Sequence, residues 1–169
     1  MHFPSRPRAL ARASTLIALL PLLMSACASE KPETEAQRLN DFATQYTAAW
    51  CSHNAPSVAA YFAEYGSFQI NQGTPAIGRP AITASVRSFM AAFPDLKVKM
   101  DGLAVDGTRI TYHWTFTGTN TGPGGTGNHV RISGYEEWRF GADRHLAESK
   151  GHFDEADYQR QLKSGAAGA

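Results

Sequence analysis

Charge and cysteine are both scarce in this sequence. Charged residues make up 18% of the 169 positions and hydrophobic residues 43%, a balance that excludes a disordered, highly charged chain. The formal net charge is +1, and the three arginines near the N-terminus, Arg6, Arg8 and Arg12, leave the remainder slightly acidic. Because phosphate groups are bound by basic surfaces, we expect no nucleic acid among the partners of this protein.

The sequence also lacks the patterns of metal, cofactor and phosphate sites. Two cysteines, Cys27 and Cys51, are too few for a disulfide framework, and we expect Cys51 to pack as a small apolar residue. The histidines are scattered and do not have the spacing of metal ligands. The glycine-rich segment 122–128 lacks the Lys-Ser/Thr ending of a phosphate-binding loop. We therefore expect neither a metal nor a cofactor.

The N-terminal segment has the pattern of a secretion signal. Residues 13–24 form an apolar run that follows the arginines and is too short to span a bilayer. The run ends in Ser25, Ala26 and Cys27, which resembles the lipobox of bacterial lipoproteins. This resemblance implies that residues 1–26 are a signal peptide and that Cys27 is lipidated. The alternative is an ordinary secretory signal with a coincidental cysteine.

A lipidated Cys27 would anchor the protein in the bacterial envelope. Residues 27–36 are small and polar and include Pro32, so we expect a tether there rather than a folded element. Ala28, rather than aspartate, follows the cysteine. By the sorting rule of Gram-negative lipoproteins, this implies attachment to the outer membrane with the domain facing the periplasm.

Hydrophobic periodicity predicts helices first and strands afterwards. Apolar residues recur at intervals of three and four in residues 35–52 and again between Gly78 and Pro94, which indicates two amphipathic helices. A short helix capped by Asn54 and a short strand after Gly66 lie between them.

From Leu96 onward the apolar period changes to two, which indicates strands. Asp106-Gly107 has the composition of a hairpin turn. A short closing helix over residues 155–162 and a tail over 164–169 complete the chain. Helices followed by an antiparallel meander define the α+β class.

Six segments together resemble the nuclear-transport-factor-2-like cone fold, and within it the SnoaL-like polyketide cyclases and ester cyclases. In chain order they read AAWCSHNAPSVAAYFAE, IGRPAI, AAFPDLKVKMDGLAVDG, WTFTGTNTGP, YEEWRF and LAESKGHFDEADYQRQL. The resemblance implies one domain over residues 37–163, a cone-shaped α+β barrel whose N-terminal helices pack in the concave face of a curved antiparallel sheet. This fold hosts isomerases, cyclases, hydrolases and plain binding proteins, so it does not decide the chemistry.

The resemblance also points to three catalytic candidates. Asp154, in the ending GHFD, matches the acid/base aspartate of SnoaL-like cyclases, which moves a proton next to a carbonyl without a cofactor. Alternatively, Asp154 caps the helix that follows it. Tyr46 and Glu136 match the tyrosine and the protonated acid in the oxyanion hole of ketosteroid isomerase, although Tyr46 could simply be a core residue. Alternation also places Glu136 on an apolar, inward face of its strand. The base of that isomerase would fall near Ile70, so we do not expect steroid isomerisation.

Strand parity and composition indicate six ligand-binding candidates. The aromatic ones are Phe68, Tyr112, Trp114 and Trp138. Alternation along residues 146–152 adds Lys150 and His152 to the same inner face. Ester-cyclase relatives tend to carry tryptophan at the position of Lys150. The lysine therefore pairs with Glu136, Glu148 or Asp154 and neutralises the site, binds an acidic ligand, or reaches solvent along its aliphatic stem.

Two classes of function remain open at this point. We favour a membrane-tethered domain that binds a small apolar or amphipathic molecule, because the substrates of polyketide ring closure are made in the cytoplasm. The alternative is a cofactor-free acid/base enzyme. A cavity in which Lys150 neutralises the acids favours binding, whereas Glu136 and Asp154 without ionic partners favour the enzyme. The expected outer face of the sheet is polar, which predicts a monomer or a weak homodimer.

Overall fold

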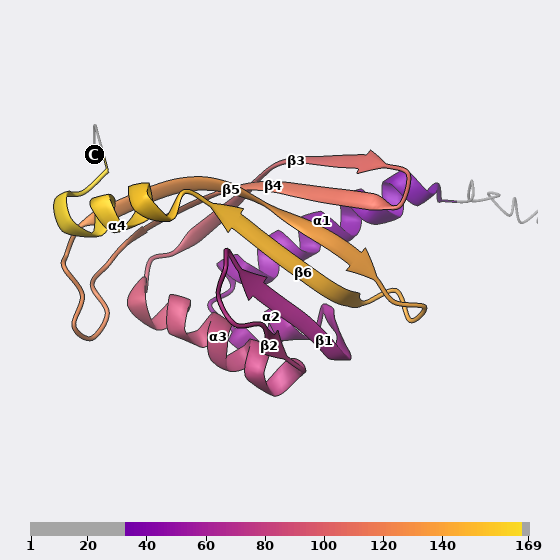
Figure 1. Ribbon diagram of the computed structural model, residues 1–169, viewed down its shortest axis with the longest axis horizontal. Coiled ribbons are helices and arrows are strands. Elements are labelled where there is room, and N and C mark those ends of the chain that lie inside the picture. Colours follow the sequence, from indigo (N-terminus) through magenta and orange to yellow (C-terminus); the bar gives the residue numbers. More distant parts are fainter. Residues whose placement is uncertain (1–32, 167–169) are drawn as a thin grey trace, which may run out of the picture. The chain divides into compact units, whose positions relative to one another are not determined.

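The computed structural model describes residues 33–166, so the predicted signal peptide and the Cys27 lipidation site lie outside the described residues. Figure 1 shows the helices and strands of this part. They are α1 (Glu35–Cys51), α2 (Ala55–Ala59), β1 (Phe62–Ile70), β2 (Ala76–Ile77), α3 (Arg79–Ala92), β3 (Lys97–Asp106), β4 (Arg109–Thr119), β5 (His129–Phe140), β6 (Leu146–Phe153) and α4 (Glu155–Ser164). No helix in this part of the chain is long and apolar enough to cross a membrane.

The strands form one six-stranded sheet in the order β2-β1-β6-β5-β4-β3. Neighbouring strands are antiparallel, except that β1 and β6 run parallel. The sheet is curved, with α1, α2 and α3 on one side of it, and α4 follows β6 at one end (Figure 1). The α+β class and the curved sheet with helices on one face are therefore as predicted.

Helix α1 forms because its N-terminus is capped and one of its faces is apolar. Thr34 and Gln37 make a capping box, in which the side chain of each accepts a hydrogen bond from the backbone N–H of the other. The buried face consists of Leu39, Ala43, Tyr46, Ala49 and Trp50. The helix ends at Cys51, which was predicted to be packed but is exposed. Its Sγ lies 3.2 Å from the carbonyl oxygen of Val98.

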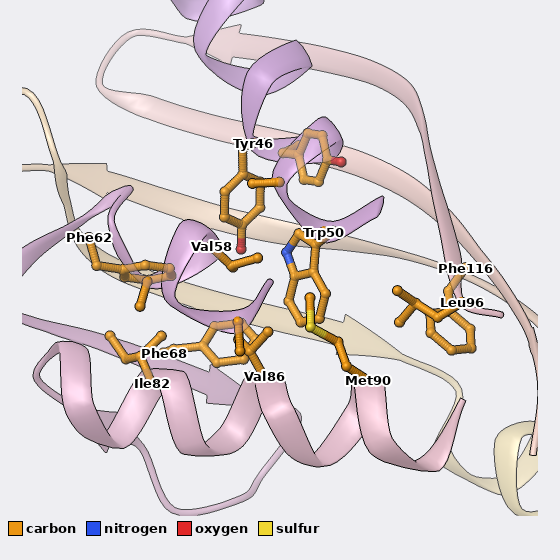
Figure 2. Close-up of a cluster of buried hydrophobic side chains, with 14 of the residues drawn as sticks. Tyr46, Trp50, Val58, Phe62, Phe68, Ile82, Val86, Met90, Leu96 and Phe116 are labelled. Atoms are coloured by element: carbon orange, nitrogen blue, oxygen red, sulfur yellow. The ribbon is translucent and has the colours of Figure 1, made fainter. Parts of the chain in front are cut away.

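The core lies between the helices and the concave face of the sheet. In Figure 2, Ile82, Val86 and Met90 point from α3 towards α1 and β1. They face β1, where the rings of Phe62 and Phe68 pack edge to face with centroids 5.8 Å apart. These side chains pack α3 against β1 within one hydrophobic core.

A bulge in β6 changes the alternation of its side chains. Glu148 pairs with Arg139 of β5, and Leu146 pairs with the next β5 residue, Phe140. Ala147 therefore has no partner on β5 and is the extra residue of a β-bulge. An extra residue moves every side chain on one side of it to the opposite face.

The consequence is a correction to the predicted inner face of the last strand. Ser149 is fully buried, and Gly151 and Phe153 line a cavity on the concave side of the sheet. Lys150 and His152 alternate with them and lie on the outer face of the sheet, so their predicted place on the inner face is wrong. Regular alternation from Leu146 does not detect a bulge, which explains the error.

Candidate functional site

A cavity of about 60 Å³ lies between the concave face of the sheet and helices α1, α3 and α4. Its wall is mostly aromatic and includes Trp50, Phe68, Phe89, Tyr112, Trp114, Phe153 and Tyr158. Figure 2 shows two of these, Trp50 on α1 and Phe68 on β1, among the core side chains. The cavity is far smaller than the roughly 300–1,000 Å³ of sites for drug-sized ligands, so it suits a molecule of few atoms.

Glu136 on β5 is the one acid among the residues that line the cavity. Its side chain is buried, and its Oε2 accepts three hydrogen bonds. The donors are the Ser149 hydroxyl at 2.7 Å, the Trp138 indole N–H at 2.8 Å and the Tyr46 hydroxyl at 3.2 Å. No lysine, arginine or histidine within residues 33–166 forms an ion pair with it.

These surroundings act in opposite directions on the protonation of Glu136. Burial away from water raises the pKa of its carboxyl, and the three donors only partly offset that effect. All three donors converge on Oε2, whereas Oε1 has only the Tyr46 hydroxyl at 3.5 Å. When the carboxyl takes up a proton, Oε2 therefore serves best as the carbonyl oxygen, and the O–H forms at Oε1.

Tyr46 is a positioning residue for this carboxyl. It is fully buried, and burial together with the charge of Glu136 raises the pKa of its hydroxyl. The prediction that Tyr46 and Glu136 lie together is consistent with their contact. However, the hydroxyl of Tyr46 is directed at Glu136, and Tyr46 is not among the residues that line the cavity.

Tyr112 and Trp138, two further predicted residues, form a stacked pair beside the carboxyl. Their rings lie 4.7 Å apart and are tilted by 14°. Tyr112 lines the cavity and shares a hydrogen bond of 2.6 Å with the Thr47 hydroxyl. Trp138 is buried behind the cavity wall, where its indole N–H is used by Glu136.

Asp154 does not lie in the cavity. It is exposed and caps α4, because its Oδ1 accepts a hydrogen bond from the backbone N–H of Asp157 at 2.9 Å. Of the two roles considered for Asp154, the geometry supports the helix cap. Asp154 is not among the residues that line the cavity, although its neighbour Phe153 is.

The other two polar candidates belong to the outer face. The Nζ of Lys150 lies 3.2 Å from the Oε1 of Glu148, so Lys150 neutralises neither Glu136 nor Asp154. The ring of His152 stacks on Tyr135 at 4.8 Å. Neither side chain can touch a molecule bound in the cavity.

Trp114 on β4 lines the cavity, as predicted for a pocket wall, and a glycine on the neighbouring strand leaves room for its indole. Gly134 pairs with it across the sheet. A Cβ on Gly134 would lie only 2.6 Å from the Cζ2 atom of Trp114, so the indole lies directly against the backbone of β5. The ring of Phe153 packs on the indole from β6, with centroids 6.2 Å apart.

Several residues at the site were not predicted from the sequence. Trp50, Phe89 and Tyr158 line the cavity from three different helices, and Ser149 donates to Glu136. An isolated glycine within a predicted strand indicates that another group approaches its backbone closely. Gly134 is such a glycine, and the group that approaches it is the indole of Trp114. Within residues 33–166, no group of three or more His, Cys, Asp and Glu side chains is placed to hold a metal ion.

Comparison with known proteins places this fold among the cone-shaped α+β proteins. Residues 40–162 match the family model of the SnoaL-like polyketide cyclases. The chain belongs to this family. A comparison with curated proteins gave no significant match.

Solved structures with the same fold share little sequence with this chain. A putative SnoaL-like polyketide cyclase from Jannaschia sp. CCS1 is 14% identical, with a TM-score of 0.68, over 80% of this chain and 99% of that one. A putative polyketide cyclase from Acidithiobacillus ferrooxidans is 22% identical, with a TM-score of 0.64, over 79% and 100%. A protein with a ketosteroid isomerase-like fold from Catenulispora acidiphila, solved in complex with trimethylamine, is 16% identical, with a TM-score of 0.65, over 72% and 92%. At these identities the likeness establishes the fold alone.

Proposed function

We propose that this protein is a membrane-tethered SnoaL-like domain that binds a small, mainly apolar or amphipathic molecule in its cavity. The observation that carries the proposal is an aromatic cavity with a single buried acid and no cation in its wall. Such a wall offers a ligand apolar contact together with very few polar groups, which is the usual composition of a small-molecule site. The complex of the Catenulispora acidiphila protein with trimethylamine supports a ligand of similarly few atoms.

A cavity-filling variant tests the binding of a small molecule. Gly151 lines the cavity, and a Cβ there would lie 3.8 Å from the Cγ of Glu136 and 3.5 Å from the nearest backbone oxygen, an ordinary contact. We expect Gly151→Ala to fold normally and to weaken the binding of cyclopentanone, a small ring probe, by about tenfold, because the new methyl group occupies ligand space. Titration followed by ¹H–¹⁵N NMR measures both affinities.

The matched control for this variant is Gly102→Ala. A Cβ on Gly102 meets nothing within 4 Å, and Gly102 lies on β3 away from the cavity wall. We expect this variant to bind the probe like the wild type. Equal binding by Gly151→Ala and wild type would contradict a ligand in this cavity.

A second candidate function is cofactor-free acid/base catalysis by Glu136. It is favoured by a buried carboxyl that has no ionic partner, which is the arrangement expected of the enzyme rather than of the binding protein, and whose pKa is raised, as required of a general base. Against it, Asp154 lies outside the cavity, which leaves one titratable carboxyl there. Running the cyclopentanone titration in D₂O separates the two functions: an enzyme would exchange the protons next to the carbonyl, and Glu136→Gln would stop the exchange.

The tether is tested by fractionation of cells that express the full chain. If Cys27 carries lipid, the wild type stays with membranes after a carbonate wash, and Cys27→Ser releases the protein. Cys51→Ser is the matched control, because Cys51 is the other cysteine of the chain and lies in the folded domain. A Cys27→Ser protein that still sediments with membranes would refute the anchor without affecting the cavity.

A further inference from the structure

The buried carboxyl of Glu136 has its hydrogen-bond donors outside the cavity wall. Glu136 lines the cavity, whereas the donors to its Oε2 belong to Tyr46, Trp138 and Ser149, which do not line it. Hydrogen bonds from neutral groups favour the charged form of a carboxyl but do not cancel its charge. In the part of the chain that the structure describes, no cationic side chain pairs with Glu136. The acid beside the cavity therefore lacks a counter-ion.

Aromatic side chains make up most of the remaining wall. Eight of the residues that line the cavity are aromatic, and they come from three helices and three strands. They are Trp50, Phe68, Phe89, Tyr112, Trp114, Phe116, Phe153 and Tyr158. An aromatic ring attracts a cation within about 6 Å of its centroid, and the attraction is stronger where water is excluded. The wall thus combines a single acid with many groups that favour positive charge.

The small volume of the cavity keeps any occupant close to these groups. With about 60 Å³ available, a ligand of few atoms contacts the wall on several sides. A charge on the ligand then lies within the roughly 4–6 Å over which an opposite charge stabilises a carboxylate. Coulomb attraction depends on distance, so it does not require one particular atom to be aimed at the ligand. An anion has no such partner, because the lining residues include no lysine, arginine or histidine.

The kind of cation follows from the scarcity of ligand groups. A metal ion needs several oxygen ligands, and no group of three or more His, Cys, Asp and Glu side chains in residues 33–166 is placed to hold one. A primary ammonium brings three N–H donors that need acceptors, whereas methyl groups on the nitrogen suit an aromatic wall. On the basis of the proposed binding function, we infer that the cavity selects a small methylated ammonium ion, whose charge is balanced by Glu136 and whose methyl groups contact the aromatic rings.

Two compact tetrahedral probes of similar size test this inference. Tetramethylammonium is charged, and tert-butanol is not. At neutral pH we expect the wild-type protein to bind tetramethylammonium about tenfold more tightly, because charge pairing and cation–π contact outweigh the desolvation of the ion. Methylammonium should bind more weakly than tetramethylammonium, because its N–H groups lose water without gaining enough acceptors. Titrations followed by ¹H–¹⁵N NMR measure these affinities.

The pH dependence of binding provides a second measurement on the wild type. Burial raises the pKa of Glu136 in the free protein, and a bound cation lowers it, so binding at acidic pH releases a proton. The affinity for tetramethylammonium should rise by up to about tenfold per pH unit and level off above the pKa of Glu136 in the free protein. The affinity for tert-butanol should stay nearly constant. Burial raises the pKa values of Tyr112 and Tyr158 in the wall and of Tyr46 behind it, so these neighbours stay neutral.

Glu136→Gln and Glu137→Gln form a matched pair of variants, because each removes one negative charge from β5. Glu137 lies on the outer face of the sheet, where its Oε2 is 3.6 Å from the Nε2 of His152. We expect Glu136→Gln to lose both the preference for the cation and the pH dependence, and Glu137→Gln to retain both. Gly151→Ala should weaken the binding of tetramethylammonium if the ion occupies the cavity.

The outcomes separate this inference from the proposed function. Equal affinities of the wild type for the two tetrahedral probes, an affinity for tetramethylammonium that does not change with pH, or binding that Gly151→Ala leaves unchanged would overturn the inference. Each of these results stands even if Glu136→Gln folds poorly, and cyclopentanone binding would still support a small-molecule site. If neither cyclopentanone nor the tetrahedral probes perturb any signal from the cavity, the proposed function itself fails.

Discussion

Replacing Glu136 with leucine is expected to lower the free energy of unfolding by about 3 kcal/mol, because three buried donors lose their common acceptor. The Ser149 hydroxyl, the Trp138 indole N–H and the Tyr46 hydroxyl all converge on Oε2. Leucine is close to glutamate in volume, so the loss is due to unpaired polar groups more than to a cavity. Urea denaturation at neutral pH measures the change.

Glu136→Gln is the matched control for this substitution. Glutamine keeps one carbonyl oxygen that can accept from the same three donors, so we expect it to cost about 1 kcal/mol or less. If the leucine and glutamine variants unfold at the same urea concentration, with equal slopes, the network around Oε2 contributes little to stability. That result would also remove the basis for assigning the acidic proton to Oε1.

The stability of the protein is expected to fall as the pH rises from the acidic range, because of Glu136. Burial raises the pKa of this carboxyl in the folded state, so the folded protein keeps a proton that the unfolded chain has already released. The contribution is fully present below the pKa of the unfolded chain and is lost as the pH rises through the folded-state pKa. Between these two values, one such group lowers the free energy of unfolding by about 1.4 kcal/mol per pH unit.

Comparison with Glu136→Gln isolates this effect from other titrations. The hydrogen bonds from Thr119 and Thr115 lower the pKa values of Asp95 and Asp101, so these two groups cost stability only as the pH falls through their folded-state values. The glutamine variant keeps both of them. A difference in unfolding free energy between wild type and variant that stays constant from acidic to neutral pH would show that Glu136 does not titrate abnormally.

Much of the fold could be predicted because it follows from local patterns. The change of apolar period at Leu96 marks the step from helices to strands, and the structure has helices α1 to α3 before it and strands β3 to β6 after it. Alternation placed Tyr112 and Trp114 on the inner face of β4, and both line the cavity. Glu136 was predicted to face inwards by the same argument, and it is buried.

The errors arose where one residue decided the geometry. Ala147 has no partner on β5, and this bulge moved Lys150 and His152 to the outer face. Asp154 comes immediately before α4, where the unpaired N–H groups of the first turn recruit its carboxylate as a cap. The bulge depends on strand pairing that alternation along a single strand does not encode, whereas the helix cap was one of the two roles predicted for Asp154 from the sequence.

The sequence by itself determined the α+β order, the apolar faces of the main helices and the inward direction of Glu136, because these depend on periodicity along the chain. The tertiary structure alone decided which side chains meet. It joined Tyr46, Trp138 and Ser149 at one carboxylate oxygen and left the Trp114 N–H without a partner. Such contacts depend on the register between strands and on whether a glycine leaves space for a large ring on the neighbouring strand. Both are determined only when distant segments of the chain pack together.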